Sequence, residues 1–184
     1  MKKRMIYILA FLLAAVFLAS CGAKENVSVA KGEGILSSFT TETLAGEKVT
    51  ETVLSGHKVN MINVWGTYCN PCINEMPSLG DLNSAYGERG FQIIGIPVDV
   101  TDSACRPVPA QIDKANQIIA STGAGYLHVL PSQDLNNAFL SEVQVIPYTI
   151  FVDENGVQLG EPYIGSRTMD QWEAVIKTLL EAEE

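Results

Sequence analysis

Positive charge is scarce in this sequence: 12 lysine and arginine residues stand against 21 aspartate and glutamate residues, which leaves a net charge of −9 at pH 7. A chain this acidic repels phosphate backbones, so we expect no nucleic-acid partner. Histidine is limited to His57 and His128. The two histidines and the four cysteines show no zinc-finger spacing, so we also expect no metal site.

Long apolar runs are absent after residue 20, so no later segment is able to span a bilayer. Before that point, Lys2, Lys3 and Arg4 precede an almost unbroken apolar run over residues 5–19, the layout of a secretory signal peptide. The run ends in Leu-Ala-Ser-Cys, which resembles the bacterial lipobox and implies that Cys21 is lipidated and becomes the mature N-terminus. An ordinary signal peptide and an uncleaved anchor helix are the alternatives.

Internal repeats and low-complexity tracts are also lacking, and the chain divides into three parts. We expect a lipoprotein signal peptide at residues 1–20, a flexible tether with the lipidated cysteine at residues 21–36, and a folded domain at residues 37–184. Hydrophobic residues make up 47% of the chain and charged residues 18%, which suits a globular core. The three cysteines of the domain would lie outside the cytosol, where thiols are not kept reduced.

Strand and helix patterns alternate along the domain. We expect strands at residues 39–44, 48–50, 58–65, 91–98, 127–130, 148–152 and 157–164, and helices at residues 72–86, 110–122, 134–143 and 168–181. Gly46 and Gly156 mark tight hairpin turns, and Thr168 with Gln171 forms a capping box. Strands linked through helices pair in parallel, whereas a tight hairpin pairs antiparallel. The order therefore predicts an α/β fold with a central mixed β-sheet flanked by helices.

The segment that carries chemistry is Cys69-Asn-Pro-Cys72, between a buried strand and a helix. Two cysteines three apart at a helix start can bring their sulfurs into bonding range. Cys69 lies at the N-terminal end, where unpaired amides and the helix dipole favour the thiolate that attacks disulfides. Cys72 lies one turn further in and suits resolution of a mixed disulfide. A zinc site and a purely structural disulfide are the alternatives; the first lacks further ligands, and the second closes too short a loop to stabilise much.

The string Trp-Gly-Thr-Tyr-Cys69-Asn-Pro-Cys72 resembles the thioredoxin superfamily active site. More closely, it resembles the TlpA/ResA-type membrane-anchored thiol–disulfide oxidoreductases, which are related to the redoxin and AhpC/TSA groups. The resemblance covers residues 39–180 and implies a thioredoxin-like fold. That fold would carry an N-terminal β-hairpin extension and an insert between the Cys72 helix and the cis-proline strand. The family's cis-proline falls at Pro147, and its active-site glutamate falls at Glu75.

The resemblance also implies roles for residues around the two cysteines. Glu75 would exchange a proton with the resolving thiol, with a plain helix-surface acid as the alternative. The backbone at Ile146 would pair with an extended substrate segment. The implied substrate-binding residues are Trp65, Tyr68, Asn70, Pro71, Ile146 and Tyr148. Two departures from the family stand out. Tyr68 replaces the usual tryptophan. Asn63 replaces the buried acid of cytosolic thioredoxins, so that proton acceptor is absent and Glu75 becomes the stronger candidate for the role.

The resemblance implies a monomeric enzyme that reduces protein disulfides on the extracytoplasmic face of the cell membrane. It would act in cytochrome c maturation, in another extracytoplasmic thiol pathway, or as electron donor to a methionine sulfoxide reductase. Its own electrons would come from a membrane donor of the CcdA/DsbD type, and its disulfide would serve in place of a cofactor. The alternatives are a peroxiredoxin-like peroxidase, whose spacing Thr67 does not match, and a copper chaperone of the same fold. Cys105 is the cysteine of the domain that the motif leaves without a partner, and it is either a free thiol or a third redox thiol.

Overall fold

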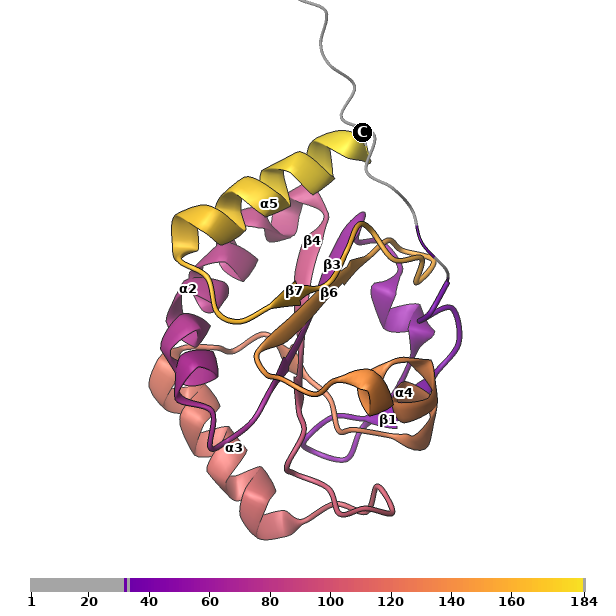
Figure 1. Cartoon of the computed structure of the whole chain (residues 1–184), viewed down its shortest axis with the longest axis vertical. Coiled ribbons are helices and arrows are strands. Elements are labelled where there is room, and N and C mark those ends of the chain that lie inside the picture. The colour runs from indigo at the N-terminus through magenta and orange to yellow at the C-terminus, as the bar shows by residue number, and fades with distance from the viewer. Residues whose placement is uncertain (1–31, 33, 184) are drawn as a thin grey trace, which may run out of the picture.

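The computed structural model describes residue 32 and residues 34–183, which form one α/β domain (Figure 1). The expected signal peptide, Cys21 and most of the expected tether lie outside the described residues. In the part of the chain that is described, no helix is both long and apolar enough to cross a membrane.

A five-stranded mixed sheet forms the centre of the domain. Its strand order is β5-β4-β3-β6-β7, with parallel pairing of β3 to β4 and of β4 to β5, and antiparallel pairing of β3 to β6 and of β6 to β7. The strands are β3 (Val59–Trp65), β4 (Phe91–Pro97), β5 (Leu127–His128), β6 (Tyr148–Val152) and β7 (Tyr163–Ile164). Every residue of β3 is buried, as expected for a central strand that is covered on both faces. The predicted mixed sheet is therefore confirmed.

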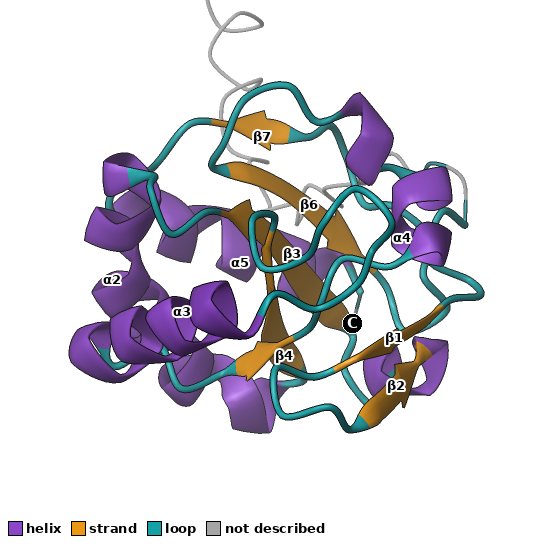
Figure 2. Ribbon diagram, turned by 90° about the horizontal axis from the view of Figure 1, so that it is seen from below, coloured by secondary structure: helices purple, strands orange, loops and turns teal. Residues whose placement is uncertain are grey.

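Alternate side chains of β3 enter two separate cores. Met61 and Trp65 join the core under α2 (Asn70–Tyr86), α3 (Pro109–Thr122) and α5 (Met169–Ala182). Ile62 and Val64 join the core on the opposite face, which is covered by α4 (Gln133–Ala138), by η1 (Glu51–Leu54) and by the segment around Leu36 and Phe39. Figure 2 shows α2 and α3 on one side of the sheet and α4 on the other. The period of two along the strand thus assembles a three-layer molecule.

The predicted N-terminal hairpin is present as β1 (Thr40–Glu42) and β2 (Lys48–Thr50), which pair antiparallel. Gly46 takes a φ of 82° in the turn between them, a conformation that glycine adopts without steric cost. An isolated bridge from Thr43 to Val129 and a bond from the Leu130 N–H to the Glu42 carbonyl tie the hairpin to the domain.

Two predicted elements are broken in the structure. Residues 157–164 do not form one strand: after a single bridge between Val152 and Gln158, pairing resumes only at β7. Gly160 has a φ of 73°, and Pro162 has no N–H to donate, so the ladder is interrupted between them. The predicted helix over residues 134–143 divides into α4 and η3 (Leu140–Glu142), because Phe139 leaves helical geometry with φ −163°.

Candidate active site

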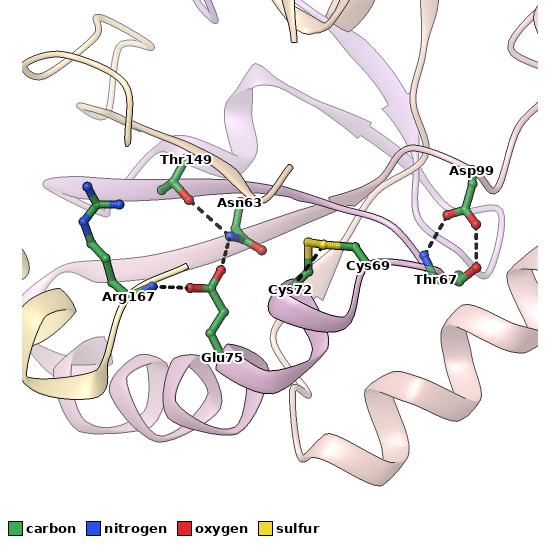
Figure 3. Close-up of a disulfide and its surroundings, with 8 residues drawn as sticks. All are labelled: Asn63, Thr67, Cys69, Cys72, Glu75, Asp99, Thr149 and Arg167. Atoms are coloured by element: carbon green, nitrogen blue, oxygen red, sulfur yellow. Dashed lines mark hydrogen bonds between the residues drawn. A yellow bond between two sulfur atoms is a disulfide. The ribbon is translucent and has the colours of Figure 1, made fainter. Parts of the chain in front are cut away.

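The two cysteines of the motif are joined at the start of α2 (Figure 3). Cys69 is the N-cap of the helix, and its Sγ accepts a hydrogen bond from the Cys72 N–H at 3.3 Å. Cys69 is 7% exposed and Cys72 is 1% exposed, so Cys69 is the more accessible of the two sulfur-bearing side chains. This N–H group and the helix N-terminus favour the Cys69 thiolate in the reduced protein. The structure therefore gives the two sulfurs the unequal environments that attack and resolution require.

A carboxylate from the neighbouring strand end holds the loop that precedes Cys69. The backbone N–H of Thr67 donates to Asp99 Oδ1 at 3.0 Å, and the Thr67 hydroxyl donates to Asp99 Oδ2. The Val98 N–H adds a bond to the Trp65 carbonyl at 2.8 Å, which continues the β3–β4 ladder towards the loop. Since the Thr67 hydroxyl is committed to Asp99, it is not free to bind a peroxide beside Cys69. Sequence reasoning did not identify Asp99, because 32 residues separate the two partners.

Glu75 lies one turn after Cys72 on α2 and points into the protein, with 4% of its surface exposed. Its Oε2 accepts the Arg167 N–H at 3.0 Å and the Trp172 indole N–H at 3.1 Å, while Oε1 accepts Asn63 Nδ2 at 3.3 Å. The interpretation of Glu75 as a plain helix-surface acid is therefore wrong. Burial raises the pKa of Glu75, and the three hydrogen bonds oppose that rise without cancelling it. A carboxyl group held this way is suited to take up a proton.

The segment before β6 closes the other side of the site. The Ile146–Pro147 peptide bond is cis, as the resemblance implied. A Cβ added at Gly66 would lie 3.0 Å from Ile146 Cδ1 and 3.1 Å from Tyr68 Cε1, so both side chains pack against the backbone of the active-site loop. Tyr68 and Ile146 also line one groove of about 380 Å³, together with residues of the loop after β4 and of η3. The groove is therefore lined by Tyr68, the residue before Cys69, and by Ile146 of the cis-proline segment.

The expected substrate-binding residues differ in accessibility. Tyr68 is 66% exposed, Asn70 and Pro71 are exposed, and Tyr148 is partly exposed, so these side chains can meet a partner protein. Trp65 is fully buried, so in this structure it offers a substrate no surface. Its indole N–H donates to His128 Nδ1 at 3.3 Å. Trp65 therefore supports the end of β3 from within the core.

His128 is buried at the end of β5 and bonds to residues on both sides of its ring. Its ring accepts the Trp65 N–H at Nδ1, bonds the Ala124 carbonyl through Nε2 at 3.0 Å, and stacks on Tyr126 at 4.6 Å between centroids. Burial lowers the pKa of His128 to about 4. The imidazole is therefore neutral at physiological pH and keeps its proton on Nε2.

No three His, Cys, Asp or Glu side chains among residue 32 and residues 34–183 are placed together as metal ligands. Cys105 is the free cysteine of that part of the chain; its Sγ accepts Asn136 Nδ2 at 3.1 Å in the loop after β4. Its backbone φ is 58°, the left-handed region.

Comparison with known families matches residues 35–159 to the AhpC/TSA family. The chain belongs to the AhpC/TSA family. It is 30% identical over 164 residues to "Thiol-disulfide oxidoreductase ResA" of Bacillus anthracis, which covers 85% of this chain and 81% of that protein. It is 28% identical over 189 residues to the ResA of Oceanobacillus iheyensis, with 97% and 90% covered. Within the family the protein is thus TlpA/ResA-like, and it is a thiol–disulfide oxidoreductase.

Solved structures of other proteins agree with this fold. A thiol:disulfide interchange protein of the thioredoxin family from Chlorobium tepidum superposes with a TM-score of 0.64 at 22% identity, covering 83% of this chain and 96% of the other. StoA from Bacillus subtilis superposes with a TM-score of 0.58 at 17% identity, covering 77% and 98%. These likenesses establish a thioredoxin-like fold and so confirm the fold that the motif implied.

Proposed function

We propose that this protein reduces disulfide bonds of other proteins on the extracytoplasmic face of the cell membrane, where a lipid on Cys21 holds it. The observation that carries the thiol–disulfide exchange is the placement of Cys69 at a helix N-terminus, with the less exposed Cys72 and a buried carboxyl group behind it. The ResA relatives are named thiol–disulfide oxidoreductases, which is the same type of reaction. The lipobox-like sequence before Cys21 supports the anchor.

In the reduced protein the Cys69 thiolate attacks one sulfur of the substrate disulfide. A bond forms between Cys69 and that sulfur, and the other substrate sulfur leaves with the bonding electron pair. Cys72 then gives its proton to Glu75 and attacks Cys69. The Cys69–Cys72 disulfide forms, and the second substrate sulfur leaves as a thiolate. The substrate gains two electrons and the protein loses two.

Return to the reduced state needs an external dithiol, and we propose a membrane donor of the CcdA/DsbD type. The substrate would lie against the exposed Tyr68 and the cis-proline segment. Substrates of this kind occur in cytochrome c maturation, in other extracytoplasmic thiol pathways and in methionine sulfoxide reductases. The protein would act as a monomer and without a cofactor other than its own disulfide.

The reaction is tested by reducing a protein disulfide with dithiothreitol as the electron source. We expect Cys69→Ser and Cys72→Ser to abolish turnover, and Cys72→Ser to accumulate a mixed disulfide through Cys69. Cys105→Ser is the matched control and should retain wild-type turnover. Full turnover by either active-site variant would refute the mechanism.

The direction is tested by the reduction potential of the Cys69–Cys72 pair. A reductase requires a value near the roughly −270 mV of thioredoxin, whereas a value near about −120 mV belongs to an oxidant. The second result would reverse the proposed direction while leaving the exchange chemistry intact.

The anchor is tested separately, by expressing the full chain in a bacterium fed with labelled fatty acid. We expect label and membrane association in the wild type, and loss of both in Cys21→Ser. A cleaved, unlabelled protein in the soluble fraction would show an ordinary signal peptide instead.

A further inference from the structure

The two oxygens of the Glu75 carboxyl group have unequal partners, of which Figure 3 draws Arg167 and Asn63. Oε2 accepts two N–H groups at 3.0 and 3.1 Å, from the backbone of Arg167 and from the indole of Trp172. Oε1 accepts only Asn63 Nδ2, at 3.3 Å. All three donors come from segments other than α2, since Asn63 lies on β3 and the others belong to the start of α5 and the loop before it. The carboxyl group is therefore held from outside its own helix.

A proton on Oε2 would point at one of two groups that can only donate hydrogen bonds. The Arg167 N–H and the Trp172 indole N–H are donors only, and neither can become an acceptor. Both lone-pair directions of Oε2 are thereby occupied. Oε1 keeps one lone pair unoccupied by any hydrogen bond that the structure shows, so it is the oxygen able to carry the proton.

We infer that Trp172 is a positioning residue of the exchange reaction: its indole N–H fixes Oε2 of Glu75 and confines proton uptake to Oε1. The inference rests on the proposed role of Glu75 in accepting the Cys72 proton. Trp172 is fully buried, and the Arg167 guanidinium lies 5.1 Å from its ring centroid. Tyr163 meets the same ring edge-on at 5.5 Å. These contacts hold the indole N–H in place while the proton moves.

The charged and titratable groups around Glu75 come from several elements. Cys72 precedes it on α2, Arg167 lies in the loop before α5, and Tyr126 lies just before β5. Arg167 favours the carboxylate through its charge. Tyr126 is uncharged at neutral pH, because burial raises the pKa of its hydroxyl well above the ordinary value. Of these groups only Cys72 is expected to exchange a proton with Glu75 during turnover.

The first test is a titration of Glu75 by carbon NMR in protein carrying ¹³C-labelled glutamate carboxyl groups, with Glu75→Gln identifying the signal. Trp172→Phe keeps an aromatic ring but removes the donor, so the pKa of Glu75 should rise by about one pH unit. Ile176→Val, one turn further along α5, loses packing but no hydrogen bond and should leave the titration unchanged. An unchanged titration in Trp172→Phe would overturn the inference.

The second test identifies the oxygen that carries the proton, using infrared difference spectra between the wild type and Glu75→Gln at low pH. If the proton is on Oε1, the C=O bond ends at Oε2, and losing the Trp172 donor raises its stretching frequency. If the proton is on Oε2, the frequency stays the same in Trp172→Phe and the inference fails. Neither spectrum depends on turnover. Full turnover by Glu75→Gln would instead refute the proposed role of Glu75 and leave these two results standing.

Discussion

At the scale of single residues, the active-site loop depends on one carboxylate that the motif does not contain. Asp99 accepts both the backbone N–H and the hydroxyl of Thr67, two residues before Cys69. Hydrogen bonds to a charged group are worth about 1.5–3 kcal/mol each, more than a neutral pair. This pair of bonds therefore restrains the loop that leads into Cys69.

We predict that Thr67→Val slows the reaction of Cys69 with a substrate disulfide by about tenfold, because it removes one bond to Asp99. Thr67→Ser keeps the hydroxyl and should react at nearly the wild-type rate. The measurement is the rate of mixed-disulfide formation in a Cys72→Ser background. Equal rates for the Val and Ser variants would show that the hydroxyl does not position the sulfur.

Glu75 contributes unfavourably to stability once it is charged. Its pKa is higher in the folded protein than in the unfolded chain, so the folded state binds the proton more tightly. Stability is therefore lost as the pH rises from about the unfolded pKa through the higher folded value. Glu75→Gln removes this loss, and the wild-type Asn63 Oδ1, which is buried without a hydrogen-bond partner, can turn to accept the new amide.

We predict that Glu75→Gln is at least as stable as the wild type at pH 8, although it turns over slowly. Urea unfolding at pH 4 and at pH 8 checks this, and the advantage of the variant should be larger at pH 8. A variant that is less stable at pH 8 than at pH 4, relative to the wild type, would contradict the raised pKa.

The sequence was sufficient to predict residues whose roles follow from local spacing. Cys69 and Cys72 follow from their position at a helix start, and the cis bond at Pro147 follows from family resemblance. Asp99, His128 and Trp172 were not predicted, because each acts through a partner 32, 63 or 97 residues away. Such contacts can be inferred only when the sheet order is known, because no local sequence pattern indicates them.

At the scale of elements, helix α5 connects local capping to the active site. Thr168 caps the helix, and its side chain accepts the Gln171 N–H while the Gln171 side chain accepts the Thr168 N–H. Trp172 follows directly in the same first turn. A frayed helix start would therefore release the indole N–H from Glu75 as well as destabilise the domain.

We predict that Thr168→Ala lowers the unfolding free energy by about 1 kcal/mol, the usual cost of losing an N-cap side chain. Thr168→Ser keeps the cap and should differ little from the wild type. Urea unfolding provides the measurement. A loss of the same size in both variants would point to packing of the threonine methyl group rather than to capping.

Element patterns predicted the sheet better than they predicted interruptions in it. The bounds of β3 and β4 were predicted to within one residue, because both strands are short, mostly apolar and buried almost throughout. Residues 157–164 carry a similar strand pattern but break at Gly160 and Pro162. Turn conformation and a missing donor outweigh side-chain preference there.

At the scale of the whole molecule, the active site lies where the two cores meet. Ile146 packs against both of them, and Trp65 connects the end of β3 to His128 on β5. Gly95 on β4 makes room for this connection, since a Cβ there would lie within clashing distance of His128 Nδ1. The protonation state of one buried imidazole is therefore linked to the stability of the whole domain.

Acid should destabilise the protein through His128. The pKa of His128 is about 4 in the folded protein against roughly 6.5 in the unfolded chain, so only the unfolded chain takes up the proton between these values. Stability is fully present above about pH 6.5 and falls by about 1.4 kcal/mol per pH unit down to about pH 4. His128→Gln keeps a donor for the Ala124 carbonyl but does not titrate. We therefore predict that urea unfolding from pH 7 to pH 4 shows a steeper loss for the wild type than for His128→Gln. Parallel pH profiles would mean that His128 takes up its proton over the same pH range in the folded and unfolded protein, which would contradict the lowered pKa.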